Sequence, residues 1–262
     1  ILMFFCGIAH GQDYEISGRT FNEAGKKIGP ARIVVYDSNK KRIAELETPA
    51  SGKFKLKNIP DGKYIINFYG PDGYGITENV TVSGADKKDV NPQMNPNPDQ
   101  VQLKIKPTSE GSSLTWRAIS GAANYIIYRD NKEITTTNQT SYLDEVEPGE
   151  TYGYNVIVIK NDQSMGTRSI TEYGKALMQP PENIEAEAKK NNVKLTWFPV
   201  EDATGYNVYR DGEKVNSTAD NSYTDFNLKY ETEYSYSTST LDHQSDEGDQ
   251  SNNIFASTHP EI

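Results

Sequence analysis

Leu114-Thr115-Trp116 and the longer stretch Tyr125-Ile126-Ile127-Tyr128-Arg129-Asp130-Asn131 are the most informative parts of this sequence, because both recur further along the chain. Leu195-Thr196-Trp197 repeats the first, and Tyr206-Asn207-Val208-Tyr209-Arg210-Asp211-Gly212 repeats the second at the same offset. Two more ordered pairs are Ser141-Tyr142-Leu143-Asp144 with Ser222-Tyr223-Thr224-Asp225, and Glu150-Thr151-Tyr152-Gly153-Tyr154 with Glu231-Thr232-Glu233-Tyr234-Ser235-Tyr236. Ordered matches of this kind indicate two tandem copies of one domain.

Each copy is predicted to be all-β. Short runs of β-branched and aromatic residues are separated by clusters of Gly, Asn and Asp, and neither copy has a helical period of apolar residues. Asp130-Asn131 and Asp211-Gly212 are dipeptides typical of tight turns, so each predicts a hairpin between two strands.

Each copy also resembles a fibronectin type III domain, over about residues 98–258. Trp116 and Trp197 are similar to the core tryptophan of that family's second strand, and the stretch from Pro148 to Tyr154 is similar to its tyrosine-corner strand. The resemblance implies a β-sandwich in which four aromatic residues are structural core: Trp116, Trp197, Tyr154 and Tyr236. It implies no particular function, because sandwich scaffolds carry many roles.

The N-terminal part has a different β pattern. Phe54 and Leu56 alternate with lysines, which predicts a strand with one buried face, and Pro60-Asp61-Gly62 predicts a turn. The region resembles the carboxypeptidase regulatory-like, or transthyretin-like, sandwich family through these residues: Gly18, Gly25, Ala31, Val35, Thr48, Gly52, Phe54, Leu56, Pro60, Gly62, Tyr64, Gly73 and Tyr74. This is an accessory fold, and the resemblance does not imply peptidase activity, since that family's catalytic domain is a separate zinc-binding unit.

The sequence therefore predicts an all-β chain of three tandem β-sandwich modules, one transthyretin-like and two fibronectin type III-like. The predicted segments are a partial signal peptide at 1–11, the carboxypeptidase regulatory-like sandwich at 12–90, a Pro/Asn linker at 91–97, two fibronectin type III-like sandwiches at 98–177 and 178–258, and a tail at 259–262. The linker is expected to be extended and to hold the first module away from the second.

The first eleven residues are a short apolar run that ends in Ala9-His10-Gly11, which resembles the end of a secretory signal with cleavage after Gly11. The alternative is a lipid anchor on Cys6, although the residues before it make a poor lipobox. We expect a secreted or cell-surface protein of a bacterial envelope, without a transmembrane segment in the mature chain. The formal charge of -10 and pI of about 4.9 argue against nucleic acid and anionic membranes as partners.

Sequence patterns typical of catalysis are missing. The chain has neither a Gly-x-Ser-x-Gly elbow, nor a phosphate-binding loop, nor a cluster of Cys and His at the spacing of a zinc site. The three histidines, His10, His243 and His259, stand far apart, so a Ser-His-Asp triad is not expected. We therefore expect the protein not to be an enzyme.

Two sets of residues are candidates for binding. Asp242, Asp246, Glu247 and Asp249 lie within eight residues and offer oxygen ligands for Ca²⁺, although a solvated acidic loop is the favoured interpretation, because runs of charge are usually solvated. No other cofactor is expected. Tyr69, Tyr74 and Tyr173 have no counterpart in the repeat, so they are the candidates for a surface that stacks against a glycan or another ligand.

Three functions fit these observations. The first is a non-catalytic protein for binding, adhesion or spacing, with an extracellular or envelope protein or polysaccharide as partner and an undetermined oligomeric state. The second is the accessory N-terminal portion of a larger secreted hydrolase, either a glycoside hydrolase or a peptidase. The third is a calcium-stabilised adhesin.

Overall fold

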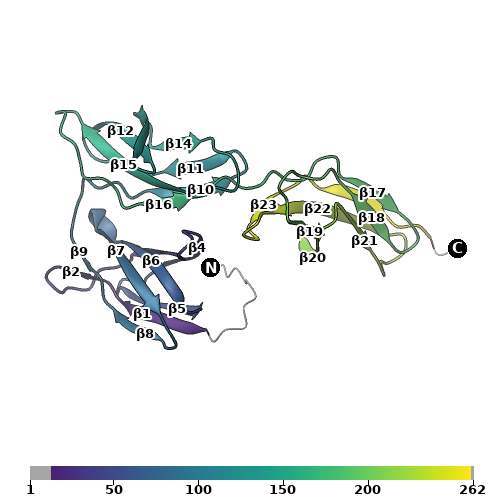
Figure 1. Ribbon diagram of the computed structural model, residues 1–262, viewed down its shortest axis with the longest axis horizontal. Helices are drawn as coiled ribbons and strands as arrows, with labels where there is room; N and C mark the ends of the chain where they lie inside the picture. Colours follow the sequence, from purple (N-terminus) through teal and green to yellow (C-terminus); the bar gives the residue numbers. More distant parts are fainter. Residues whose placement is uncertain (1–12, 261–262) are drawn as a thin grey trace. The chain divides into compact units, whose positions relative to one another are not determined.

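The computed structural model describes residues 13–260, so the predicted signal peptide and Cys6 lie outside the described residues (Figure 1). Within that range the chain is all-β apart from one 3-10 turn, η1 (Pro71–Gly73), and no helix there is long and apolar enough to cross a bilayer. The chain divides into two compact units. Unit 1 contains the described residues up to Ile105 with Leu114–Tyr142 and Thr151–Gly174, and unit 2 contains Lys106–Ser113, Leu143–Glu150 and the described residues from Lys175 onward.

The strands fall into three groups along the chain, here called the N-terminal, middle and C-terminal sandwiches. The N-terminal sandwich has β1 (Tyr14–Arg19), β2 (Phe21–Asn22), β3 (Arg32–Tyr36), β4 (Arg42–Glu47), β5 (Lys53–Ile59), β6 (Gly62–Tyr69), β7 (Gly75–Val82), β8 (Lys87–Val90) and β9 (Gln93–Met94). The middle sandwich has β10 (Lys104–Thr108), β11 (Gly111–Thr115), β12 (Ala122–Arg129), β13 (Lys132–Thr137), β14 (Ser141–Asp144), β15 (Tyr152–Lys160) and β16 (Glu172–Gly174). The C-terminal sandwich has β17 (Glu185–Ala188), β18 (Val193–Thr196), β19 (Gly205–Arg210), β20 (Glu213–Thr218), β21 (Ser222–Asp225), β22 (Glu233–Leu241), β23 (Glu247–Gln250) and β24 (Ile254–Ser257).

In the N-terminal sandwich, the sheet β5-β1-β8 and the sheet β4-β3-β6-β7 enclose one hydrophobic core. The predicted alternation in β5 is confirmed, because Phe54 and Leu56 are buried while Lys53, Lys55 and Lys57 are exposed. Strand β1 runs antiparallel to β5 and parallel to β8. A side chain at Gly18 would place its Cβ 1.8 Å from the carbonyl oxygen of Val90, so only glycine allows β1 and β8 to approach this closely.

Residues 91–97 are predicted to be a linker, but the structure places the first half of this stretch in the N-terminal sandwich. Gln93–Met94 forms strand β9, which pairs in parallel with β2. Met94 is fully buried in the N-terminal core, and Asn95 bridges to Gly75. An apolar side chain within a Pro/Asn tract therefore ties the tract to the sandwich that precedes it.

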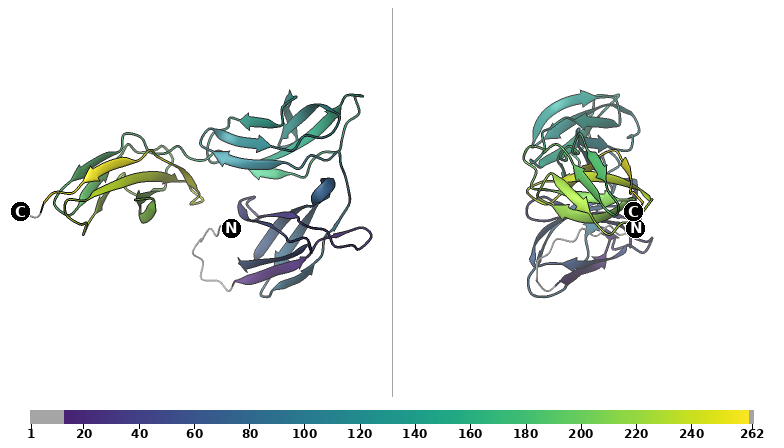
Figure 2. Two further views of the ribbon diagram at one scale, coloured as in Figure 1. Left: turned by 180° about the vertical axis from the view of Figure 1, so that it is seen from behind. Right: turned by 90° about the vertical axis from the view of Figure 1, so that its right-hand side faces the viewer.

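The middle and C-terminal sandwiches have closely similar strand orders, consistent with the sequence repeat (Figures 1 and 2). The middle one is built from the sheets β10-β11-β14 and β13-β12-β15-β16, and the C-terminal one from β17-β18-β21 and β20-β19-β22-β23, with β24 also paired to β22. Both predicted hairpins are present. Asp130 and Asn131 have φ values of 48° and 67°, and Asp211 and Gly212 have 52° and 81°, which is the geometry that a two-residue hairpin turn needs.

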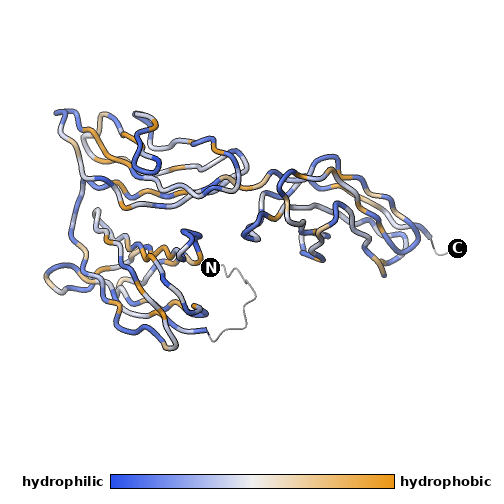
Figure 3. Tube along the Cα trace, viewed as in Figure 1, coloured by the Kyte–Doolittle hydropathy of each residue, from blue (hydrophilic) through white to orange (hydrophobic). Residues whose placement is uncertain are grey.

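The two repeats bury different side chains at several equivalent positions of β15 and β22, and one of these positions carries a hydroxyl without a partner. In the middle sandwich Val156 lies opposite Ile127, and in the C-terminal sandwich Thr238 lies opposite Val208. Thr238 is fully buried, and its hydroxyl has no hydrogen-bond partner. Strand β22 carries serine, threonine or tyrosine at most positions, which are residues of intermediate hydropathy (Figure 3), and a fully buried hydroxyl without a partner is rare in folded proteins.

We expect Thr238→Val to raise the free energy of unfolding by about 1 kcal/mol, because valine has the same shape and removes an unsatisfied buried hydroxyl. Differential scanning calorimetry of the chain measures this as a higher melting temperature for the transition of the C-terminal sandwich. The matched control is Val156→Thr in the middle sandwich, which should destabilise by a similar amount. A Thr238→Val variant that melts below the wild type would contradict this account.

Candidate functional site

The outer face of the β3–β6 sheet is buried, and it carries polar side chains that sequence reasoning did not single out as a group. Cross-strand pairing places Arg32 opposite Tyr69 and Val34 opposite Asn67. Because side chains alternate along a strand, these residues and Tyr36 face away from the N-terminal core. Val34, Tyr36 and Asn67 are fully buried on this second face, so the central strands of the sheet are covered on both sides.

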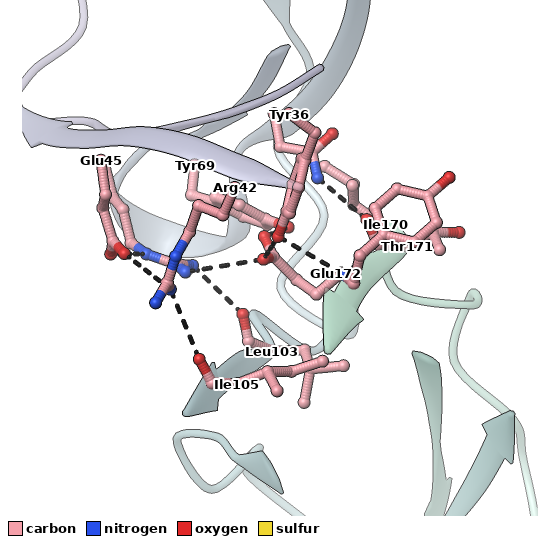
Figure 4. Close-up of polar contacts among 12 residues, drawn as sticks. Tyr36, Arg42, Glu45, Tyr69, Leu103, Ile105, Ile170, Thr171 and Glu172 are labelled. Atoms are coloured by element: carbon pink, nitrogen blue, oxygen red, sulfur yellow. Dashed lines mark hydrogen bonds and ion pairs between the residues drawn. The ribbon is translucent and has the colours of Figure 1, made fainter. Parts of the chain in front are cut away.

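Glu172 of β16 covers part of this face and is itself fully buried (Figure 4). The hydroxyl of Tyr36 donates a hydrogen bond to Oε2 of Glu172, and the hydroxyl of Tyr69 donates one to Oε1. A guanidinium nitrogen of Arg32 lies 3.8 Å from Oε2, and the guanidinium stacks over the ring of Tyr69 at 4.9 Å. We call Arg32, Tyr36, Tyr69 and Glu172 the Glu172 cluster; all four belong to unit 1.

Contacts around the Glu172 cluster hold its members in place. Arg32 Nε lies 2.7 Å from Oε1 of Glu45, and a second guanidinium nitrogen donates to the carbonyl oxygen of Leu103 at 3.1 Å. The side-chain amide of Asn67 donates to the carbonyl oxygen of Thr171 at 2.9 Å. The ring of Tyr173 meets the ring of Tyr36 edge to face at 5.1 Å. Backbone, charged and aromatic contacts thus all converge on the short segment from Ile170 to Tyr173.

Burial dominates the proton equilibria of the Glu172 cluster. It raises the pKa of Glu172, although Arg32 and the hydroxyls of Tyr36 and Tyr69 act in the opposite direction. Burial together with the neighbouring carboxyl raises the pKa of both tyrosines well above the ordinary value. Both hydroxyls therefore keep their protons and serve as hydrogen-bond donors rather than as bases.

The acidic residues predicted as calcium ligands lie in and beside the loop between β22 and β23, but other groups of the chain engage their carboxylates. The ammonium group of Lys175 lies 2.6 Å from Oδ2 of Asp242 and also contacts Asp246. Burial tends to raise the pKa of Asp242, but the hydrogen bond from Lys175 and backbone N–H donors lower it overall. Lys175 thus supplies the positive charge between these two carboxylates that a metal ion would otherwise supply.

The other two predicted ligands face different partners. Glu247 accepts hydrogen bonds from the hydroxyls of Tyr209 and Ser239, and burial with the nearby carboxylate raises the pKa of Tyr209 to about 12. Asp249 accepts a hydrogen bond from the backbone N–H of Ser109 at 3.1 Å. Among residues 13–260, no three His, Cys, Asp or Glu side chains are gathered in a way that could hold a metal ion.

Unit 2 also contains an open cleft of about 1030 Å³. Its lining includes the carboxylates of Glu110, Glu145, Glu147, Glu201, Asp202 and Asp242. His243 is in the lining too, whereas lysine and arginine are not. This charge disfavours anionic ligands in the cleft.

The tyrosines predicted for a ligand surface have different positions. Tyr69 differs from the expectation, because it is buried and its hydroxyl is bound to Glu172. Tyr173 is partly buried, and Lys40 lies 5.4 Å from the centre of its ring. Tyr74 is partly buried and packs against the N-terminal core. All three tyrosines thus make contacts inside unit 1, and Tyr69 is the most deeply buried of them.

The aromatic residues predicted as structural core are buried. Trp116 and Tyr154 lie in the core of the middle sandwich, and Trp197 and Tyr236 lie in the core of the C-terminal sandwich. Each tryptophan meets a tyrosine edge to face, with Tyr125 at 5.3 Å in one core and Tyr206 at 5.4 Å in the other. Equivalent residues of the repeat therefore fill equivalent cores.

Comparison with known proteins places part of this chain in a described class. Residues 18–96 match the SpaA family, a prealbumin-like fold domain. Prealbumin is transthyretin, so the predicted transthyretin-like sandwich in the N-terminal region is confirmed at that level. The protein is thus an all-β, modular β-sandwich protein with a prealbumin-like domain in its N-terminal region.

One curated relative is a poly(3-hydroxybutyrate) depolymerase of Ralstonia pickettii, which is 30% identical over 124 residues, or 47% of this chain and 25% of the depolymerase. The chain therefore matches only a quarter of that protein's length.

Among solved structures, the FN1-FN3 domains of chicken CNTN1 align with 15% identity and a TM-score of 0.36 over 89% of this chain and 92% of theirs. The family 28 exopolygalacturonase of Yersinia enterocolitica aligns with 14% identity and a TM-score of 0.30 over 32% of this chain and 21% of its own.

The raised pKa of Glu172 makes the stability of unit 1 depend on pH. The folded state binds this proton more tightly than the unfolded state, so the contribution of Glu172 is largest at low pH and is lost as the pH rises through its folded pKa. The charged and titratable groups that surround it are Arg32 and Tyr36 of β3, Arg42 and Glu45 of β4, Tyr69 of β6, and Tyr173 beside it on β16.

We expect the melting temperature of the wild type, relative to Glu172→Gln, to fall as the pH is raised from about 4 toward neutrality. Glutamine has nearly the same shape and does not titrate, so the difference between the two proteins isolates the proton on Glu172. The measurement is thermal unfolding followed by circular dichroism across this range. A difference that stays constant, or that grows with pH, would show that the folded carboxyl is not the better proton acceptor.

Lys175→Gln should lower the free energy of unfolding by about 2 to 4 kcal/mol, because it leaves Asp242 and Asp246 largely buried without their cation. Calorimetry with Ca²⁺ or EDTA provides a second readout, in which Ca²⁺ stabilises the variant more than the wild type. The control is Lys189→Gln, since the ammonium of Lys189 is exposed and lies 3.7 Å from Glu187. Equal stability of the two variants would refute a special role for Lys175.

Proposed function

We propose that this chain is a non-catalytic modular protein that acts at a cell surface or in the secreted space and binds or spaces a protein or a polysaccharide. The observation that supports this most is how the chain uses its distinctive residues. The repeated tryptophans and tyrosines fill cores, and the buried ionisable groups Glu172 and Lys175 are bound to other parts of the same chain. These residues support architecture, which is what a scaffold requires.

A second candidate is an accessory portion of a secreted hydrolase, and the match to a depolymerase favours it. In this proposal the sandwiches hold or present a separate catalytic domain at a polymer surface. The C-terminal sandwich has exposed aromatic side chains that suit contact with such a surface: Phe198 at 61%, Phe226 at 63% and Phe255 at 62% exposure.

Co-sedimentation with particles of poly(3-hydroxybutyrate), cellulose and chitin tests both candidates. We expect the chain to bind at least one of these polymers without releasing soluble hydroxyacid or sugar. Binding of poly(3-hydroxybutyrate) alone would favour the hydrolase-accessory candidate, whereas binding of a polysaccharide would favour the first. Release of soluble product would refute the proposal that the chain is non-catalytic.

A triple variant, Phe198→Ala with Phe226→Ala and Phe255→Ala, serves as the specificity control. These side chains are exposed, so their removal should leave the cores intact and weaken polymer binding. Tyr230→Ala is the matched control, since Tyr230 is a less exposed aromatic residue of the same sandwich at 38%. Unchanged binding by the triple variant would show that these aromatics do not contact the polymer.

A further inference from the structure

The outer face of β3–β6 contacts the segment Ile170–Tyr173 in two ways: it binds the side chain of Glu172, and it hydrogen-bonds to the backbone of the segment. Asn67 donates to the carbonyl oxygen of Thr171, and the backbone N–H of Tyr173 lies 3.4 Å from the hydroxyl oxygen of Tyr36 and donates to it. Val34, Tyr36 and Tyr69 form a small apolar cluster that Ile170 and Tyr173 pack against. The face therefore binds an extended segment along its length, with a charged contact at the centre.

The central contact suits a carboxyl group in particular. Each of the two oxygens of Glu172 accepts a hydrogen bond from its own tyrosine hydroxyl, and the guanidinium of Arg32 lies beside Oε2. A carboxylate offers two acceptor oxygens, whereas an amide offers one and would place an N–H₂ group against the second hydroxyl. Hydrogen bonds from neutral donors to an ionised acceptor are also stronger than those to a neutral acceptor.

Arg32 and Asn67 on the receiving side are held by contacts other than those to Glu172. Arg32 is fixed by Glu45 and by the carbonyl oxygen of Leu103, and its guanidinium stacks on Tyr69. The side-chain oxygen of Asn67 accepts a hydrogen bond from Thr77 at 2.8 Å. All of the receiving side chains stand on strands whose opposite face packs into the N-terminal core. The site should therefore keep its shape when the glutamate side chain is removed.

We propose that Arg32, Tyr36 and Tyr69, with Asn67 beside them, form a carboxylate-binding site on the outer face of β3–β6, and that Glu172 of the same chain is its resident ligand. The chemical class of ligand is a carboxylate, here carried on an extended segment whose backbone Asn67 and Tyr36 also contact. The proposal concerns a site inside unit 1 and does not rest on the proposed function.

Replacement of Glu172 by alanine allows a direct test, because the atoms removed beyond Cβ are a methylene and a carboxylate, which together match acetate. We expect Glu172→Ala to melt below the wild type. Sodium acetate should then raise its melting temperature by about 2 to 4 °C more than sodium chloride at equal ionic strength. Acetamide should not reproduce the effect, and acetate should not raise the wild type above its value in chloride, because there the site is filled.

A double variant, Glu172→Ala with Tyr69→Phe, is the matched control. It keeps the ring and removes one of the two hydroxyl donors, so the acetate-dependent rise should become smaller. If Glu172→Ala melts with the same dependence on acetate and chloride as the wild type, the proposal is wrong. If that variant does not fold in chloride, its refolded yield in acetate is measured instead. A yield that depends on acetate supports the site, and equal failure in both salts overturns it.

Discussion

A carboxyl group that loses its water on folding must recover equivalent interactions from the protein around it, and Glu172 obtains them from β3 and β6. This requirement explains why two tyrosine hydroxyls and an arginine lie on a sheet face that would otherwise be apolar. It also explains why Arg32 has a second partner in Glu45, since a guanidinium with one distant counterion would itself be poorly compensated. The arrangement joins residues of the N-terminal sandwich to residues of β16 within one compact unit.

The sequence repeat predicted the all-β fold, both hairpin turns and the inward position of the repeated tryptophans and tyrosines. These features are encoded locally, in strand-length patterns and turn dipeptides, and they are recognisable without knowledge of the partners in space. The alternation of Phe54 and Leu56 with lysines is of the same kind, and the structure agrees with it. The prealbumin-like region was similarly predictable from ordered glycines and apolar residues.

The Glu172 cluster could not be predicted in this way, because Glu172 lies more than a hundred residues from Tyr36 and Tyr69 in the sequence. One signal was nevertheless present. Ile33-Val34-Val35-Tyr36 is a continuous apolar run rather than an alternating one, and a run of this kind indicates a strand that is buried on both faces. The run therefore indicates that both faces of this strand are buried, but it does not indicate which residue covers the outer face. The ion pairs of Lys175 could not be predicted either, because Asp242 and Asp246 are far from it in the sequence and no local residue pattern indicates the pairing.

Strand β16 is the outermost strand of its sheet and has only three residues, Glu172–Gly174. An unpaired strand at the margin of a sheet exposes backbone groups that can recruit a strand from another molecule and so begin aggregation. Here the segment Ile170–Tyr173, which includes the start of β16, contacts the outer face of β3–β6, with its apolar side chains partly buried and one backbone carbonyl bound to Asn67. The N-terminal sandwich thus covers part of this sheet edge and leaves fewer free backbone groups there for a strand of another molecule to pair with.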